Sequence, residues 1–369
     1  MYRLERITAK PLSVPLTAPF VIASARVDVT PNVLVEVEVV DTKTGARAVG
    51  LGEAATLHPI TSETQAEVLQ GFATRLPPLP IEIPAPEWKL DWAVDFLNDS
   101  DSFHASASQG LSTALEDAFA RLERRPLRQI LAGPHGSVIE MITTDITLPI
   151  GEPDAMARLA LGWRTRGFTC FKVKVGKDVD GDLRALERIH LAVPDATFRI
   201  DANAAFTAAE AIGLARSCER LGLMIECFEQ PCAAEALDAM AEVAAALDIP
   251  VIADESFQRL DDLALLAKER AADGINLKLA KLGSPMSAVV IGRIARRKYG
   301  MKLMVGAMVE TRLGITAAAH VAAALGGVDF PDLDTALLLA ADPFSGGYVE
   351  QGPRLTFTTG PGLDVVQTP

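Results

Sequence analysis

The stretch Phe171-Lys172-Val173-Lys174-Val175-Gly176 is a short run of alternating apolar and basic residues that ends at a glycine. Period-two alternation around valines is typical of a strand, so Lys172 and Lys174 should point to the same face of it. A longer stretch of helical period, rich in Ala and Leu, follows this run. A strand followed by a helix is the unit from which parallel α/β folds are built.

This unit recurs from about residue 139 onward. The last strand-like residues of the units are Thr147, Lys174, Asp201, Glu229, Asp254, Lys278, Gly306 and Asp332. Successive spacings of 27, 27, 28, 25, 24, 28 and 26 residues predict the eight units of a TIM-like barrel. Six of these eight positions are charged, far more than a chain with 22% charged residues would give by chance. Because the active site of such a barrel lies at the carboxyl ends of its strands, we expect it there.

The first part of the chain has a different pattern. Residues 4–10 and 33–40 read as strands, and Gly45, Gly50 and Gly52 interrupt any regular period after them. Residues 106–123 predict an amphipathic helix. We therefore predict an α+β capping domain over residues 1–125, completed by the C-terminal tail 347–369, and a barrel catalytic domain over residues 126–346.

Composition narrows the classes of function. The 369 residues carry 35 Lys and Arg against 48 Asp and Glu, a formal charge of −13, which argues against a nucleic-acid partner. The amino terminus lacks the apolar core of a secretory signal, and residues 313–328 fall short of the roughly 20 apolar residues of a spanning helix. We therefore expect no membrane association.

Four cysteines at irregular spacings indicate neither disulfides nor zinc, so a cytoplasmic location is expected.

Asp201, Glu229 and Asp254 end three consecutive predicted strands, so their side chains should converge on one side of the barrel mouth. Carboxylates so close together would repel one another unless a cation neutralised them. All-oxygen ligation without His or Cys favours Mg²⁺ over Zn²⁺. We therefore predict these three residues as metal ligands and Mg²⁺ as the cofactor. The alternative is that they are separate, solvated carboxylates.

Two lysines flank this trio. Lys174 ends the strand before it and Lys278 ends the strand after it, which places two ammonium groups on opposite sides of the predicted metal. A carboxylate substrate on the metal would have its α-proton acidified, and each lysine could then address one face of the carbanion. A lysine that acts as a base needs a lowered pKa, which we expect from the positive charge of Lys172 and the metal. The alternative is that both lysines are ion-pair partners of the carboxylates.

The chain resembles the enolase superfamily, in its muconate-lactonizing subgroup, and within that subgroup the dipeptide epimerases. The matching runs are residues 171–176 (FKVKVG), 201–203 (DAN), 228–231 (FEQP), 253–256 (ADES) and 275–278 (INLK). The resemblance covers nearly the whole chain and implies an α/β fold, a modified TIM barrel (β/α)₇β with an α+β capping domain that closes over the substrate. It implies Lys174 and Lys278 as the acid/base pair and Lys172 as a residue that helps to hold the enolate. It also implies Mg²⁺ on the three carboxylates.

The reactions of this subgroup include epimerisation, cycloisomerisation and dehydration. Asp332-Leu333-Asp334 resembles the Asp-x-Asp pair with which dipeptide epimerases hold the α-ammonium group of their substrate. Two acids facing the metal across the site would select a substrate with a cation at one end and a carboxylate at the other, or else they merely begin a loop. Thr147 and the segment around Val309 also resemble epimerase residues near the substrate. For Glu310, a structural hydrogen bond is at least as well supported as catalysis.

One expected substrate contact departs from the family pattern. Epimerases that act on Ala-Glu carry an arginine in the first loop of the capping domain, and here Ser24 or Ala25 falls at that position. Arg26 is the neighbouring arginine, so Ser24 and Arg26 both enter the predicted substrate-binding set. The expected substrate is therefore L-Ala-D/L-Glu or a dipeptide with an apolar second residue.

The leading hypothesis is a Mg²⁺-dependent dipeptide epimerase that works by 1,1-proton transfer at the α-carbon of the C-terminal residue, through an enediolate. An o-succinylbenzoate synthase or muconate cycloisomerase of the same subgroup is the nearest alternative, but those substrates have no ammonium group for Asp332 and Asp334. A barrel that has lost catalysis and serves as a metal-dependent binding protein is the alternative from another class. The expected partner is a small-molecule dipeptide, and a homo-oligomer is compatible with the sequence.

Overall fold

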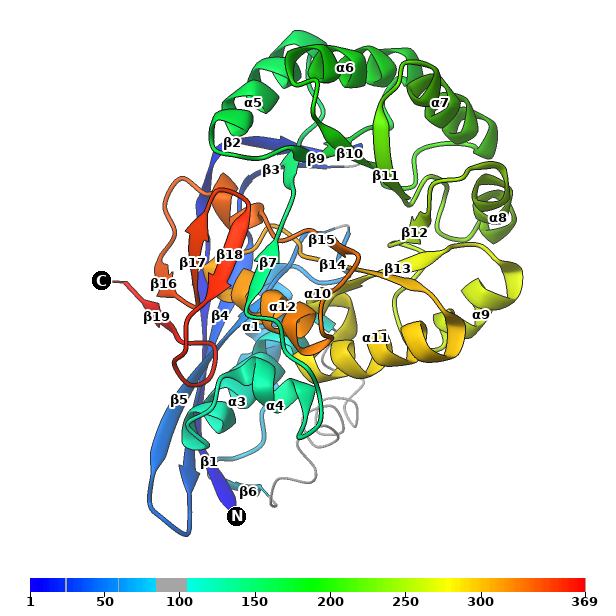
Figure 1. Cartoon of the computed structure of the whole chain (residues 1–369). Helices are drawn as coiled ribbons and strands as arrows, with labels where there is room; N and C mark the ends of the chain where they lie inside the picture. Colours follow the sequence, from blue (N-terminus) through cyan, green and yellow to red (C-terminus); the bar gives the residue numbers. More distant parts are fainter. Residues whose placement is uncertain (24, 59, 84–104, 369) are drawn as a thin grey trace.

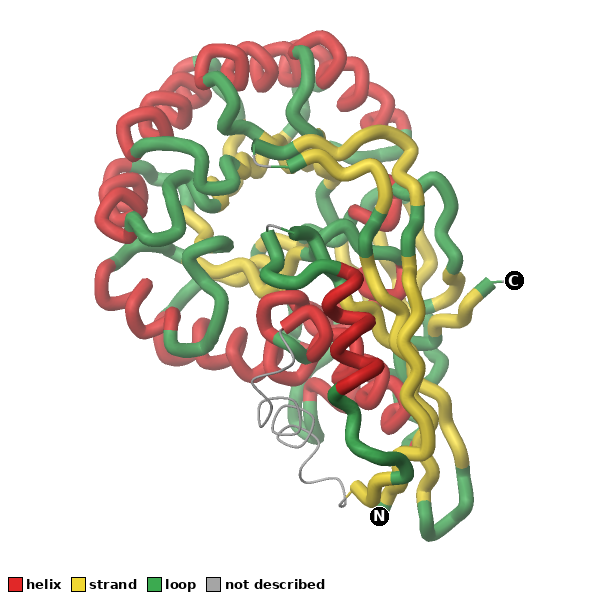
Figure 2. Tube along the Cα trace, turned by 180° about the vertical axis from the view of Figure 1, so that it is seen from behind, coloured by secondary structure: helices red, strands yellow, loops and turns green. Residues whose placement is uncertain are grey.

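The computed structural model describes residues 1–23, 25–58, 60–83 and 105–368, and it divides into a large ring and a smaller unit beside it (Figure 1). The ring is an eight-stranded parallel sheet that curls on itself, with helices around its outside. The same arrangement is visible from behind, where strands line the inside of the ring (Figure 2). The predicted barrel with an additional N-terminal unit is confirmed.

The strands of the large sheet follow one another in chain order. They are β8 (Ile146–Leu148), β9 (Cys170–Lys174), β10 (Thr197–Asp201), β11 (Met224–Glu229), β12 (Val251–Ala253), β13 (Gly274–Lys278), β14 (Lys302–Gly306) and β15 (Phe330–Pro331). The helices between them are α5 (Pro153–Thr165), α6 (Val179–Ala192), α7 (Ala208–Arg220), α8 (Leu237–Ala246), α9 (Asp262–Glu269), α10 (Leu279–Leu282), α11 (Pro285–Tyr299) and α12 (Arg312–Ala324). No α-helix follows β15 in the described chain up to residue 368, where the 3₁₀ helix η2 (Thr335–Leu338) is the one helical element, and this is the order of a (β/α)₇β barrel.

The predicted strand ends agree closely with these bounds. Five of the eight coincide with the last residue of a strand, and Thr147, Asp254 and Asp332 differ from it by one position. The register brings the ends of neighbouring strands together, because Asp201 is the Cα partner of Lys174 on one side and of Glu229 on the other. The charged residues therefore share one rim of the barrel.

The first and last strands of the sheet, β8 and β15, are joined by side chains. The amide of Leu333 donates to Thr144 Oγ1 at 2.8 Å, and the amide of Thr147 donates to Asp334 Oδ2 at 2.5 Å. Backbone amides that a neighbouring strand would otherwise satisfy are thus bonded to side chains. These bonds hold the segment after β15 against β8.

The capping unit is built on an antiparallel sheet of order β5-β4-β1-β6. Its elements are β1 (Tyr2–Leu12), β4 (Asn32–Asp41), β5 (Arg47–Ala54), β6 (Ile81–Ile83), α1 (Gln65–Thr74) and α3 (Ala105–Leu122), with the hairpin of β2 (Pro15–Val21) and β3 (Arg26–Val29) beside it. Alternate valines of β4, among them Val35 and Val37, pack with Leu111 and Leu115 of α3. The predicted strands at residues 4–10 and 33–40 and the helix at residues 106–123 are confirmed. None of the described helices combines the length and the apolar character needed to cross a membrane.

The C-terminal tail contacts both units. It contains β16 (Phe344–Gly346), β17 (Tyr348–Gln351), β18 (Arg354–Phe357) and β19 (Val365–Gln367), and β18 pairs with β7 (Met141–Thr143), which lies between α4 (Leu127–Ala132) and β8. The tail also reaches the cap, since the amide of Leu363 donates to Asp117 Oδ1 of α3 at 2.7 Å. It therefore joins the entry to the barrel with the helix of the cap.

The expected break at Gly50 and Gly52 is wrong, since both residues lie within β5. A Cβ atom built on Gly50 would lie 1.9 Å from the carbonyl oxygen of Ala114, and one on Gly52 would lie 2.0 Å from that of Gly110. Helix α3 thus lies so close to the strand that a side chain has no room. Glycine in a strand marks such a close approach of backbones as readily as it marks a break.

This contact predicts the effect of alanine at Gly52. The G52A substitution should lower the free energy of unfolding by about 1–3 kcal/mol or more, because backbone must move to admit the methyl group. The matched control is G213A in α7, where an added Cβ meets no atom within 4 Å and should stabilise by about 0.5–1 kcal/mol. Urea unfolding of both variants measures the difference. A G52A protein as stable as the wild type would contradict the close packing of α3 on β5.

Candidate active site

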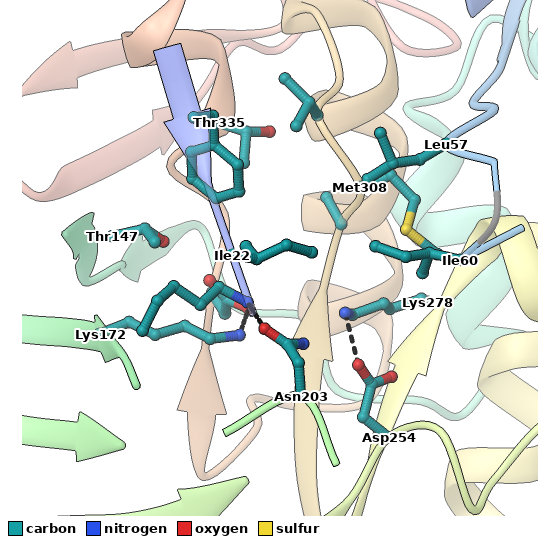
Figure 3. Close-up of a pocket in the computed structure, with 15 residues that line it drawn as sticks. Ile22, Leu57, Ile60, Thr147, Lys172, Asn203, Asp254, Lys278, Met308 and Thr335 are labelled. Carbon is teal, nitrogen blue, oxygen red and sulfur yellow. Dashed lines mark hydrogen bonds and ion pairs between the residues drawn. The ribbon is translucent and has the colours of Figure 1, made fainter. Parts of the chain in front are cut away.

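The predicted lysines gather at the carboxyl ends of the barrel strands. Lys172 and Lys174 come from β9 and Lys278 from β13, and all three side chains are buried. Lys172 and Lys278 enter the pocket from opposite sides, with Asn203 and Asp254 below them (Figure 3). The period-two argument that placed Lys172 and Lys174 on one face agrees with this geometry.

Lys172 is surrounded by carboxylates. Its Nζ lies 2.6 Å from Glu229 Oε2, 2.7 Å from Asp332 Oδ2 and 3.0 Å from Asp201 Oδ2. Lys174 Nζ lies 2.6 Å from the same Asp201 oxygen. One carboxylate oxygen of Asp201 therefore joins both lysines of β9.

Lys278 faces the third predicted metal ligand. Its Nζ lies 2.7 Å from Asp254 Oδ2, while Lys281 Nζ lies 2.7 Å from Asp254 Oδ1. Burial would raise the pKa of Asp254, but Lys278 and Lys281 outweigh it and hold the pKa below its usual range. Asp254 thus remains ionised and connects two cations at its side of the rim.

The expected lowering of the pKa of Lys278 is not found in this structure. Burial lowers the pKa of this ammonium, but Asp254 and Glu229 raise it by more, so the net shift is upward. The same holds for Lys172, where Asp332, Glu229 and Asp201 outweigh burial. The ion pairs between lysines and carboxylates, which the alternative interpretation of the sequence named, are thus present in the structure.

The charges around the barrel mouth favour an additional cation. Six buried carboxylates face four buried cations: Asp145, Asp201, Glu229, Asp254, Asp332 and Asp334 against Lys172, Lys174, Lys278 and Arg199. Half-buried Glu255, Lys281 and Glu226, of which Glu226 contacts Arg199, add two negative charges and one positive charge. When all are ionised, the negative charges exceed the positive ones by three, and a divalent cation would offset most of this excess. Burial and the negative charge of Asp201 raise the pKa of Glu229 to about 7, so the ionised form of this carboxyl is destabilised by its surroundings.

Asp201, Glu229 and Asp254 offer only oxygen ligands, are fully or almost fully buried and lie at the carboxyl ends of three adjacent strands. This donor set suits Mg²⁺. A second acidic trio, Asp145, Asp332 and Asp334, has carboxylate oxygens that all lie within 4.8 Å of one another. By distance alone this second trio is the more compact group for a cation.

Asp145 is a residue that the sequence reasoning missed. It is fully buried directly before β8, and Arg199 Nη1 lies 2.9 Å from its Oδ2. Burial raises the pKa of Asp145 well above its usual range, against the opposing charge of Arg199. The period-two argument used for Lys172 would have found both residues. Asp145 lies two positions before Thr147, and Arg199 lies two positions before Asp201.

The predicted ammonium-binding pair is buried beside this group. Asp332 accepts from Lys172, and Asp334 accepts from the amide of Thr147 through Oδ2, which leaves Asp334 Oδ1 without a hydrogen-bond partner. Burial and the charge of Asp332 raise the pKa of Asp334 to about 6. A buried oxygen without a donor is costly, so this position favours a ligand that carries N–H groups.

The remaining predicted substrate residues differ in position. Thr147 and Val309 line the pocket. The carbonyl of Val309 accepts from Asn32 Nδ2 of the cap at 2.8 Å. Ser24 lies outside the described residues, and Arg26 is an exposed residue of β3 that does not line the pocket.

Glu310 makes structural hydrogen bonds. It accepts from Gln109 Nε2 of α3 at 3.1 Å and from the amide of Met308 at 3.0 Å. Burial and the neighbouring Glu53 raise its pKa to about 8. Because Glu310 does not line the pocket, these bonds support its structural role.

The sequence pattern of the family described as "Enolase C-terminal domain-like" matches residues 155–366. The chain belongs to the enolase superfamily. The L-Ala-D/L-amino acid epimerase of Populus trichocarpa is 36% identical over 365 residues, which cover 97% of this chain and 83% of that protein. This relationship confirms the resemblance inferred from the motifs, and the isomerase class expected for the enzyme is that of its relatives.

Solved structures of this superfamily agree over almost the whole chain. The substrate-liganded L-Ala-D/L-Glu epimerase of Bacillus subtilis has a TM-score of 0.89 at 32% identity, with 99% of each chain covered. The dipeptide epimerase of Enterococcus faecalis V583, solved with Mg and the dipeptide L-Leu-L-Tyr, has a TM-score of 0.88 at 29% identity and covers 99% of this chain and 100% of that one. The relatives thus share one fold and one reaction type with differing substrates.

The Asp145–Arg199 pair generates a prediction about stability. Replacing Arg199 by Met leaves the buried Asp145 carboxylate without its cation, which should cost about 3–5 kcal/mol of unfolding free energy at pH 8. Asp145 has a raised pKa in the folded protein, so the loss should shrink as the pH falls and the group takes up a proton. Urea unfolding of R199M at pH 8 and pH 5 measures both effects.

The double variant D145N/R199M is the matched control, because it removes the unpaired charge and should recover part of the loss. A loss in R199M that is independent of pH, or a double variant less stable than R199M, would show that Arg199 acts through packing alone.

Proposed function

We propose that this enolase-superfamily protein is a Mg²⁺-dependent dipeptide epimerase. The observation that carries the proposal is the placing of two buried lysines, Lys174 and Lys278, on β9 and β13, at either side of the strands that carry the three carboxylates. A reaction that inverts a carbon centre needs one base on each face, and this arrangement supplies them. The epimerases of Populus trichocarpa and Bacillus subtilis match almost the whole of this chain.

We propose Asp201, Glu229 and Asp254 as the ligands of Mg²⁺. The excess of negative charge at the rim and the all-oxygen donor set support a divalent cation there. Mg²⁺ would supply positive charge beside the carboxylate of the substrate, which lowers the pKa of the adjacent α-proton. A cation on Asp254 would also offset the negative charge that raises the pKa of Lys278.

The lysines perform the proton transfer. One lysine, in its neutral form, takes the α-proton of the C-terminal residue, and the electron pair of the C–H bond moves toward the carboxylate. The ammonium of the other lysine then donates a proton to the opposite face of the same carbon. Lys172, held between Glu229, Asp332 and Asp201, remains charged and stabilises the negative charge that develops on the substrate.

Asp332 and Asp334 bind the other end of the substrate. The unpartnered Asp334 Oδ1 can accept from the α-ammonium group of a dipeptide, and the carboxylates of Asp332 and Asp145 lie near it. A dipeptide zwitterion adds no net charge, so it would not add to the excess of negative charge at the rim. Substrates of a dehydratase or cycloisomerase without an ammonium group would leave this oxygen unpaired.

Proton exchange in D₂O tests the proposal. With Mg²⁺ and a panel of L,L-dipeptides, the protein should incorporate deuterium at the α-carbon of the C-terminal residue, and this is measured by mass spectrometry. Protein treated with a chelator should lose exchange and regain it with Mg²⁺. The absence of exchange with every dipeptide would refute the proposal.

Replacement of one lysine separates exchange from epimerisation. K278A should lower the rate of epimerisation by about 10²–10⁴-fold, because no group can protonate its face of the carbanion. The variant should still exchange the α-proton of the epimer whose hydrogen faces Lys174. Calorimetric titration with Mg²⁺ controls for damage to the neighbouring Asp254. Equal loss of exchange for both epimers with Mg²⁺ binding intact would contradict the assignment of one lysine to each face.

The pKa of Asp334 predicts the pH dependence of substrate binding. Its pKa is raised to about 6, and only the ionised form pairs with an ammonium group. KM for a dipeptide should therefore rise by about tenfold for each pH unit below 6 and stay level above 7. D334N should show a higher KM that no longer changes in this range. A wild-type KM that stays constant from pH 8 to pH 5 would exclude Asp334 from ammonium binding.

A further inference from the structure

We infer that the substrates are dipeptides whose C-terminal residue carries an uncharged, apolar side chain. This inference rests on the proposed function, since it concerns the side chain attached to the reacting carbon. That side chain must lie in the part of the pocket that the catalytic residues do not line. The residues that line this part decide which side chains of the substrate fit.

The pocket has one charged and one apolar side. Its charged lining residues, which include Lys172, Lys174 and Lys278, all belong to the strand ends of the barrel. The described lining residues that the cap contributes are all apolar, namely Phe20, Ile22, Leu57 and Ile60. Ala307, Met308 and Val309, which follow β14, continue this apolar wall. In Figure 3, Leu57, Ile60 and Met308 lie together on the right of the pocket, and Ile22 lies near its centre.

The cations that line the pocket are already engaged. Lys172 contacts three carboxylates, Lys174 contacts Asp201, and Lys278 contacts Asp254. No arginine is found among the described lining residues. A glutamate side chain of the substrate would therefore lose its hydration against the apolar wall without gaining a cation.

The hairpin β2–β3 explains why Arg26 does not supply that cation. Phe20 pairs with Val27 across the hairpin, whereas Arg26 pairs with Val21. Cross-strand partners share a face, and Phe20 and Val27 are both buried. Arg26 therefore lies on the opposite, outer face, where 60% of its side chain is exposed and its guanidinium binds Asp28 at 3.0 Å.

Moving Arg26 into the pocket would require a change of register. A shift of one residue moves every side chain of a strand to the other face, so Val27 would then be exposed in place of Arg26. The burial of Val27 opposes such a shift. The side of the hairpin that faces the substrate is thus apolar because of its strand register.

Three dipeptides of nearly equal size test the inference: L-Ala-L-Met, L-Ala-L-Gln and L-Ala-L-Glu. The rate of α-deuterium exchange per unit of substrate concentration, measured with the Mg²⁺-loaded protein, should fall in that order. The difference between Met and Glu should be about 100-fold or more. Exchange of L-Ala-L-Glu as fast as that of L-Ala-L-Met would overturn the inference and leave the epimerase proposal intact. Absence of exchange with all three and with every other dipeptide would instead refute the proposed function.

Two variants localise the effect. I60R adds a guanidinium to the half-buried edge of the apolar wall and should raise the ratio of Glu to Met exchange by at least about tenfold, through a new ion pair. R26A should leave that ratio unchanged, because Arg26 lies on the outer face. A selective loss of L-Ala-L-Glu exchange in R26A would show that Arg26 reaches the substrate and would overturn the inference. Circular dichroism and Mg²⁺ titration establish that each variant is folded.

Discussion

The compensation of buried charge at the mouth of the barrel is the constraint on which the rest of the structure depends. Parallel strands bring their ends to one rim, so the carboxylates of β10, β11 and the residue after β12 are forced close together. Lys172 contacts Glu229, Asp332 and Asp201, and Arg199 neutralises Asp145 beneath them. Removing either cation would leave a buried negative charge, which is far more costly than the loss of a surface ion pair. The same charges that catalysis requires therefore also determine whether the barrel is stable.

Most of this rim could be predicted from the sequence, because the carboxyl ends of the strands in such a barrel carry the active site. A spacing of 24 to 28 residues identified each unit, and the last residue of a short apolar run located each side chain to within one position. Asp145 and Arg199 were missed because they lie at the beginning or in the middle of a strand segment. A charged residue at such a position normally argues against a buried strand. Period two would have found both, since each lies two positions before a residue already assigned to the interior.

Other features depend on distances that no local pattern contains. Gly50 and Gly52 were read as breaks because their neighbours along the chain offered no other reason for glycine. The reason is the backbone of α3, which is more than 50 residues away in the chain and meets the position of a Cβ at about 2 Å. The upward shift of the Lys278 pKa also depends on such a distance. Its ammonium lies 2.7 Å from Asp254 Oδ2, a contact that only the folded register reveals.

The cap and the barrel contribute different properties to one pocket. The cap is tied to the barrel near Val309, since Asn32 Nδ2 donates to the Val309 carbonyl and Glu53 accepts from the amide of Thr311 at 3.1 Å. The cap therefore positions its part of the apolar wall, whereas the charged residues among the described pocket lining belong to the barrel. A substitution at Ile22 or Ile60 changes which side chain fits, whereas the charges of the rim remain in place. Because part of the apolar wall lies in the cap and the charged rim lies in the barrel, the preference for a side chain can change while the rim stays the same. We infer that the register of a single hairpin, which decides whether Val27 or Arg26 shares the face of Phe20, also contributes to the preferred substrate.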